Sequence, residues 1–289
     1  MSLRRTLLRS PGLLLAMVLP GCAYHHPRSS DALFPDTPVV MGHRGARGLA
    51  PENTMAGFER AADLGVSFEL DTMICGSGEL VVIHDWDLMR LAGVEGRVAE
   101  TPWSELSGLD VGSHHSPEFL GEGIPLLADV LREISPRVLI NIEVKADRST
   151  DNGRVADKLV ALLAEQGLED RVIVTSFSPL MLEAVRLRNA AILRGQIYRG
   201  FSAYEDNSFV EKLVLSKLLF NGKAQPDLLM MDHQRAEPRY VRRMKRRGYR
   251  VFTWTVNEPE RALELFAMGV DGVITDYPDR MLPLLEGGS

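Results

Sequence analysis

Short apolar runs alternate with longer amphipathic stretches along this chain of 289 residues, beginning near Val39. This alternation is typical of parallel strands joined by crossover helices. The runs predict strands near residues 38–42, 67–71, 138–143, 172–176, 192–197, 228–232, 250–255 and 271–275. Eight such strands indicate a single α/β domain over residues 37–286, folded as a closed (β/α)₈ TIM barrel.

The amphipathic stretches predict the intervening helices. Thr54 is suited to cap the first helix, and Ser178-Pro179 begins another with a proline where a missing N–H has no cost. Helices are expected near residues 54–64, 154–166, 179–188, 207–220, 238–247, 259–267 and 278–285.

One excursion interrupts this rhythm after the second strand. The chain turns at Gly76-Ser77-Gly78 and returns through Leu80–Ile83, which predicts a hairpin that extends the strand. Residues 86–128 then form a long insertion rich in glycine and proline. Segments of this length between barrel elements usually cover or shape the site, so we expect this one to do so.

The first residues indicate export. The apolar run Leu13–Leu19 follows three arginines and is too short to span a bilayer, which predicts a signal peptide over residues 1–21. Leu19-Pro20-Gly21-Cys22 resembles the lipobox of bacterial lipoproteins. That resemblance implies a lipidated Cys22, a polar tether over residues 22–36 and a place in the cell envelope, on the periplasmic face of a membrane if the source is Gram-negative. Plain secretion and an uncleaved anchor are the alternatives.

Composition narrows the choice of partners. The hydrophobic content of 45 % is ample for a large core, and a formal charge of -6 argues against general nucleic-acid binding. The chain has only two cysteines, so a lipidated Cys22 would leave Cys75 without a disulfide partner.

Acidic residues lie near the ends of two predicted strands. Glu69 and Asp71 are two residues apart and therefore point the same way, and Glu143 and Lys145 repeat this spacing on the next barrel strand. Three converging carboxylates repel one another unless a positive group lies between them. Oxygen ligands favour one hard divalent cation, Ca²⁺ or Mg²⁺. The alternative is that Glu143 pairs with Lys145 or Arg44 and no metal binds.

Basic and imidazole groups accompany these acids. Arg44 can hold two phosphate oxygens at once, whereas Lys145 acts as a point charge. His43 and His84 can donate and accept protons near neutral pH, although a buried histidine is more often a structural residue. Asp85 could orient His84 or cap a helix.

Six short motifs, taken in order, resemble the glycerophosphodiester phosphodiesterase family over roughly residues 38 to 283. The resemblance implies a divalent metal on Glu69, Asp71 and Glu143, and an acid–base pair of His43 and His84. It also implies that Glu52 lies beside the metal site and that the insertion helps to define the substrate pocket. The motifs are His43-Arg44-Gly45 with Pro51-Glu52-Asn53-Thr54, Glu69-Leu70-Asp71, His84-Asp85, Glu143-Val144-Lys145, Trp254-Thr255-Val256-Asn257 and Gly272–Pro278.

The expected activity is metal-dependent hydrolysis of glycerophosphodiesters to sn-glycerol 3-phosphate and an alcohol. Trp254 would pack on the glycerol or alcohol moiety, unless it belongs to the core. One alternative is lysophospholipase D activity on lysophospholipids, which an apolar mouth formed by residues 86–128 and 201–224 would favour. The alternative from another class is an envelope lipoprotein that binds phosphodiesters without catalysis.

Some further stretches have weaker interpretations. The basic helix over residues 239–247 is expected to be a solvated outer helix rather than a lipid contact, and the apolar stretch Phe209–Phe220 to pack on the barrel. His25 and His26 are expected to lie in a solvated linker. His114-His115 and Asp232-His233 are weak candidates for substrate contact.

Overall fold

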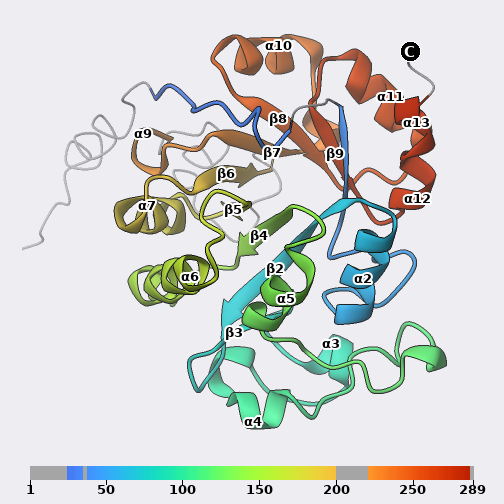
Figure 1. The fold of residues 1–289 in the computed structure, drawn as a ribbon, viewed down its shortest axis with the longest axis vertical. Helices are drawn as coiled ribbons and strands as arrows, with labels where there is room; N and C mark the ends of the chain where they lie inside the picture. The colour runs from blue at the N-terminus through green and yellow to red at the C-terminus, as the bar shows by residue number, and fades with distance from the viewer. Residues whose placement is uncertain (1–24, 35–37, 200–220, 287–289) are drawn as a thin grey trace, which may run out of the picture.

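The structure, a computed structural model, describes residues 25–34, 38–199 and 221–286. Eight parallel strands close into a barrel because the first and second strands also pair with each other (Figure 1). The predicted TIM barrel is therefore confirmed. Its strands are β1 (Val39–Gly42), β2 (Ser67–Ile74), β4 (Ile140–Val144), β5 (Val172–Ser176), β6 (Leu193–Tyr198), β7 (Leu228–Asp232), β8 (Arg250–Trp254) and β9 (Gly272–Thr275).

The hairpin predicted after the second strand is also present. β3 (Leu80–Val82) runs antiparallel to the end of β2, with Thr72 opposite Val82. β2 is therefore longer than its barrel neighbours and continues beyond the mouth, where the hairpin supports the inserted segment.

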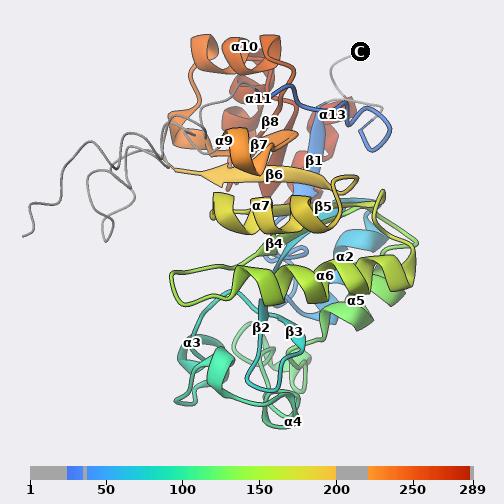
Figure 2. The ribbon, with the colours of Figure 1, turned by 90° about the vertical axis from the view of Figure 1, so that its left-hand side faces the viewer.

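Helices surround the barrel (Figures 1 and 2). The two predicted caps are confirmed: the Thr54 side chain accepts a hydrogen bond from Gly57 N–H, and Ser178 accepts one from Met181 N–H. The barrel helices are α2 (Met55–Asp63), α5 (Leu127–Ile134), α6 (Asn152–Gln166), α7 (Pro179–Arg188), α9 (Asn221–Ala224), α10 (Pro238–Arg246), α11 (Pro259–Ala267), α12 (Pro278–Met281) and α13 (Pro283–Glu286).

Two helix predictions need comment. The helix predicted over residues 278–285 is divided into α12 and α13, because Pro283 has no N–H to continue the hydrogen-bond ladder. The helix predicted over residues 207–220 lies outside the described residues. Among the helices that the structure describes, none has the length and apolar character needed to cross a membrane.

The insertion is a folded layer rather than a loose loop. Its short helices are α3 (Met89–Ala92), η2 (Val98–Glu100), α4 (Trp103–Leu106) and η3 (Pro117–Phe119). They cover the hairpin with a small core of their own, made of Met73, Cys75, Val81, Ile83, Leu88, Leu91, Val98, Leu106, Val111 and Ile124. The hairpin and this core hold the start of the insertion rigidly beside the barrel mouth.

The barrel interior is packed with apolar side chains below the mouth, including Met41, Met230 and Phe252. Phe34 closes the opposite end: it is 2 % exposed, and its ring centroid lies 5.1 Å from that of Phe252. The barrel therefore has one closed end and one end open to ligands.

Residues 25–34 differ from the solvated tether that the sequence predicts. Arg28 donates to Asp227 through Nη2 at 2.6 Å, and Arg250 pairs with Asp31. His25 is half-buried, and burial lowers its pKa. This part of the expected tether lies against the barrel, because the buried Phe34 and these two ion pairs hold it there.

Candidate active site

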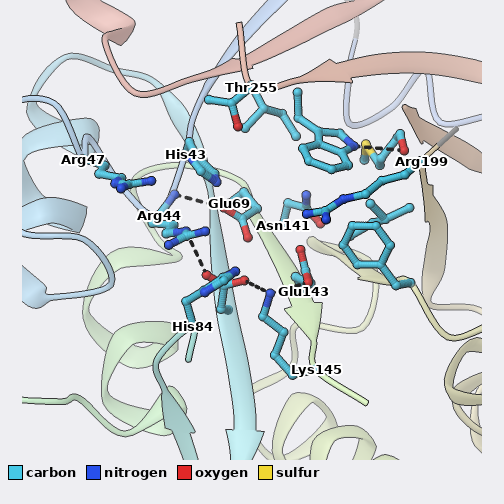
Figure 3. A pocket seen from close by; sticks show the side chains of 16 residues that line it. His43, Arg44, Arg47, Glu69, His84, Asn141, Glu143, Lys145, Arg199 and Thr255 are labelled. Atoms are coloured by element: carbon cyan, nitrogen blue, oxygen red, sulfur yellow. Dashed lines mark hydrogen bonds and ion pairs between the residues drawn. The ribbon is translucent and has the colours of Figure 1, made fainter. Parts of the chain in front are cut away.

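A cavity of about 270 Å³ opens at the carboxyl ends of the barrel strands (Figure 3). This is the end at which residues from different strands meet. The cavity includes all the predicted metal, histidine and phosphate-binding residues. It is lined by His43, Arg44, Arg47, Glu69, Asp71, His84, Asn141, Glu143, Lys145, Phe177, Ile197, Arg199, Met230, Trp254, Thr255 and Ile274.

Three buried carboxylates converge on this cavity. Glu69 and Asp71 point inward from β2, and Asp71 lies directly opposite Glu143 of β4 in the sheet register. One carboxylate oxygen of each residue lies within 4.8 Å of the others. Burial, followed by the charges of its acidic neighbours, raises the pKa of Glu69 well above its ordinary value. Burial likewise raises the pKa of Glu143.

Two cations partly balance this cluster. Lys145 Nζ lies 2.8 Å from Asp71 Oδ1 and 2.7 Å from Glu143 Oε1, and Arg44 Nε lies 3.3 Å from Asp71 Oδ2. Although burial opposes it, these cations lower the pKa of Asp71. The pairing of Glu143 with Lys145 is therefore present. It does not exclude a metal, because Glu69 has no side-chain cation within ion-pair distance among the described residues.

The residues present fit a hard divalent cation. The three carboxylates supply only oxygen donors, and the raised pKa values of Glu69 and Glu143 show that a further positive charge would stabilise their ionised forms. Asn141 lines the same cavity and offers an N–H donor suited to a substrate oxygen rather than to the cation, while its Oδ1 accepts a hydrogen bond from Thr175. It is 1 % exposed, and its Nδ2 has no hydrogen-bond partner within the described part of the chain.

Arg44 is held in place by a tight loop. It adopts φ 51°, and the following Gly45 adopts φ 82° where a side chain would strike the backbone of Gly57. The Arg44 N–H donates to Glu69 Oε2 at 3.0 Å, and its guanidinium donates to Glu52 at 2.7 Å. The loop therefore directs a guanidinium and a backbone donor at the acid cluster together.

Glu52 lies beside Arg44. It accepts hydrogen bonds from Arg44 and Arg90 and forms an ion pair with Arg47. Although burial opposes it, these arginines lower the pKa of Glu52 to about 2. Glu52 therefore holds these arginines, and Arg44 connects it to Asp71 of the acid cluster.

The two histidines have matching supports. His43 Nδ1 lies 2.6 Å from Asp276 Oδ1, and the other oxygen of Asp276 accepts a hydrogen bond from Asn257. His84 Nδ1 lies 2.6 Å from Asp85 Oδ1. A carboxylate on Nδ1 fixes the ring and leaves Nε2 as the nitrogen available to a substrate. Asp85 therefore orients His84, one of its two predicted roles.

The environment of His84 favours the neutral ring. Burial lowers the pKa of His84, and the charges of Lys145 and Arg44 add to this effect. Arg90, from α3 of the insertion, donates to both Asp85 and Glu52. The Arg90 side chain thus links Asp85, which holds His84, to Glu52, which holds Arg44.

Several contributing residues were not singled out from the sequence. Asp276 contacts His43 and accepts a hydrogen bond from Asn257, an arrangement that depends on the meeting of β1, β8 and β9. Arg90 carries no local signal, because only the insertion fold brings it to Glu52. Asn53, next to the cap residue Thr54, donates to Asp71 at 2.9 Å.

The side of the cavity near Trp254 is apolar. The Trp254 indole donates to the carbonyl of Met230, and its ring stands edge-on to Phe177. The guanidinium of Arg199 lies over both rings, 5.1 Å and 5.2 Å from their centroids. Trp254 therefore lines the cavity and also packs against the barrel core, and its contact with a glycerol or alcohol moiety stays a prediction.

The two weak candidates lie apart from this cavity. Asp232 caps the short helix η5 (His233–Arg235) through a bond from Gln234 N–H. His114 and His115 are exposed in the insertion and do not line the cavity.

A TIM barrel with two supported histidines and an acid cluster at its mouth has the arrangement of a hydrolytic enzyme. The sequence profile of the Glycerophosphoryl diester phosphodiesterase family matches residues 43–280, and the chain belongs to this family. The enzyme class expected from the motifs is confirmed.

Individual relatives agree with this assignment. A glycerophosphodiester phosphodiesterase of Caldanaerobacter subterraneus is 32 % identical, over 86 % of this chain and 98 % of its own length. A human lysophospholipase D is 28 % identical, over 86 % of each chain. The structure of an Oleispira antarctica phosphodiesterase in complex with the product sn-glycerol-3-phosphate has a TM-score of 0.76 and 28 % identity, covering 87 % of this chain and 98 % of its own.

Proposed function

We propose that the enzyme hydrolyses glycerophosphodiesters to sn-glycerol 3-phosphate and an alcohol by acid–base catalysis with His43 and His84. The observation that carries this proposal is the pair of imidazoles at one cavity, each bound at Nδ1 by a carboxylate 2.6 Å away. The acid cluster of Glu69, Asp71 and Glu143 lies in the same cavity, and so does Arg44. The similar Oleispira antarctica enzyme, solved with sn-glycerol-3-phosphate, supports the choice of substrate.

The two rings divide the proton transfers. One imidazole takes the proton of the attacking hydroxyl while a new bond forms to phosphorus. That hydroxyl belongs either to water, which gives sn-glycerol 3-phosphate directly, or to the substrate, which gives a cyclic phosphate that water opens in a second step. The other imidazole gives a proton to the departing alkoxide oxygen as the bond between that oxygen and phosphorus breaks. Burial keeps the pKa of His84 low, which suits a base that is neutral before the reaction.

Arg44 and Lys145 stabilise the negative charge on phosphorus oxygens. Arg44 can donate two parallel hydrogen bonds, and Lys145, which contacts the other oxygen of Asp71, adds a compact charge. A divalent cation, Ca²⁺ or Mg²⁺, would be held by Glu69, Asp71 and Glu143. When bound it would supply Lewis-acid polarisation of the phosphate.

Chelation tests the metal and the reaction together. Purified enzyme is treated with EDTA, and release of choline from glycerophosphocholine is measured before and after Ca²⁺ or Mg²⁺ is restored. We expect activity to disappear and to return with one of the two cations. Full activity after exhaustive chelation would contradict the metal proposal, and no release under any condition would contradict the choice of substrate.

Lysophospholipase D activity is the second candidate, because a human relative with that name aligns over 86 % of this chain. Trp254 and Phe177 line one side of the cavity, and residues 201–220 of the predicted mouth lie outside the described residues. Comparing kcat/KM for lysophosphatidylcholine and glycerophosphocholine decides between the two. A higher value for the acylated substrate would favour the second candidate.

We also propose that the enzyme is an envelope lipoprotein attached through Cys22. The support is the arginine-rich, apolar leader followed by Leu19-Pro20-Gly21-Cys22. Metabolic labelling with a fatty acid tests this. Label should enter the wild-type chain but not the Cys22→Ser variant.

A further inference from the structure

Helix α10 presents one wholly basic face. Its apolar residues Val241 and Met244 are buried against the barrel. Four arginines follow the spacing i, i+3, i+4, i+7 and therefore lie together on the other side of the helix. This arginine face consists of Arg239, Arg242, Arg243 and Arg246, and all four are exposed.

None of these arginines forms an ion pair with an acidic residue among the described residues, and Arg243 lies over the Tyr240 ring at 5.1 Å. By contrast, Lys245 on the flank of the same helix pairs with Asp271. Four positive charges on one face of a helix repel one another. The whole chain, by contrast, carries a net charge of -6. A local positive face on a negative protein is suited to an anionic partner.

Pro27 lies beside the C-terminal end of this helix. A side-chain carbon at Gly248, two residues beyond α10, would lie 3.6 Å from Pro27 Cδ. Arg28 is fixed next to Pro27 by its bond to Asp227, so the position of this corner is set by the fold. Figures 1 and 2 both show α10 at the end of the molecule away from α3 and α4.

The short chain between the proposed membrane anchor and His25 points to a membrane as the partner. The apolar run of the leader ends at Leu19, six residues before His25, and Cys22 is three residues before it. An extended chain spans at most about 3.5 Å per residue, so attachment at either position holds the α10 corner within roughly 20 Å of a membrane. Lysine and arginine residues near an anionic bilayer surface are attracted to it.

We propose that the arginine face of α10 binds the anionic head groups of a phospholipid bilayer. The barrel would then rest on the flank that carries α10, with the catalytic mouth opening along the surface rather than into it. The proposal takes its choice of partner from the envelope location argued above. It does not depend on which diester is hydrolysed.

Vesicle binding tests the proposal with the full chain. Sedimentation is compared for vesicles of phosphatidylcholine alone and vesicles with about 30 % phosphatidylglycerol, because the first reports the leader and the second adds surface charge. We expect at least about tenfold tighter binding to the anionic vesicles at low salt, and loss of this difference at about 0.5 M NaCl. The variant with Arg239, Arg242, Arg243 and Arg246 all changed to Gln should bind both kinds of vesicle equally.

A control variant removes the same amount of charge elsewhere. Arg60, Arg154, Lys158 and Arg171 are exposed and form no ion pair among the described residues, and they lie on or beside α2 and α6. Changing these four to Gln should leave the preference for anionic vesicles intact. Equal loss in both variants, or no preference in the wild type, would overturn the proposal. Unchanged turnover of glycerophosphocholine in both variants separates this outcome from a failure of the proposed activity.

Discussion

Both ends of the barrel bury charged side chains, but they do so in opposite ways. At the closed end Arg194 is 2 % exposed and Asp227 is 1 % exposed. The Asp227 carboxylate accepts hydrogen bonds from Arg28 and from the Arg194 N–H. The Arg194 guanidinium donates to the carbonyl oxygens of Ala190, Ile192, Ala224 and Gln225. Every charge there meets an opposite charge or a carbonyl dipole.

At the mouth, three carboxylates meet only two cations, Lys145 and Arg44, so the balance of charge is incomplete. Glu69, Asp71 and Glu143 converge on an open cavity, and the Asn141 amide beside them keeps a donor without a partner among the described residues. Burial of this kind is unfavourable until a ligand compensates it. Buried charge that is fully paired therefore maintains the fold, whereas buried charge that is incompletely balanced beside a cavity marks a binding site.

The largest effect is expected at the mouth. Glu69→Gln should lower kcat/KM for glycerophosphocholine by at least about 10³-fold, because a metal contact supplies several kcal/mol to the transition state. The melting temperature should stay equal to the wild-type value or rise, since the variant removes a carboxylate whose pKa burial has raised. Turnover assays and calorimetry measure the two quantities.

His43→Ala is the matched change on the catalytic side of the same cavity. It should also abolish turnover while the melting temperature stays near that of the wild type. Retained activity in either variant would refute the assignment of the site.

The second expected effect lies at the closed end, where a substitution should lower stability and leave turnover unchanged. Asp227→Ala should destabilise the fold by about 3–5 kcal/mol, because it leaves Arg194 buried without its carboxylate. Turnover per folded molecule should be unchanged. Urea denaturation with parallel assays checks this, and a stable but inactive variant would remove the distinction between the two ends.

The third effect concerns Glu52, whose charge is compensated although it lies near the mouth. The pKa of Glu52 is lowered from the ordinary 4.5 to about 2, so its ionised form stabilises the folded state. This stabilisation is fully present above about pH 4.5 and is lost as the pH falls toward 2. Glu52→Gln should therefore lower the free energy of unfolding by up to about 3 kcal/mol at pH 7. The difference between wild type and variant should shrink below pH 4.5. Denaturation at pH 7, 5 and 4 measures it, and a difference independent of pH would be the contrary result.

The smallest effect is expected at Asp276. Asp276→Asn keeps the shape of the support but weakens the orientation of His43, so kcat should fall about 10- to 100-fold. KM should change little, because Asp276 does not line the cavity. Steady-state kinetics separates the two parameters. A change confined to KM would show that Asp276 acts on substrate binding instead.

The sequence determined the fold class and most of the site. Strand and helix periodicity predicted the barrel, and the caps at Thr54 and Ser178 are where the local pattern placed them. The convergence of two acidic side chains was also readable, because a two-residue spacing in a strand puts Glu69 and Asp71 on one face. These signals are local, so a single chain segment contains them.

The tertiary structure alone decided which groups support the site. Asp276 reaches His43 across 233 residues of chain, and Arg90 reaches Glu52 across 38. It also placed Phe34 and Arg28 on the barrel, although their segment lacks any periodic pattern. Such contacts depend on how distant segments meet when the barrel closes, and no local propensity encodes that meeting.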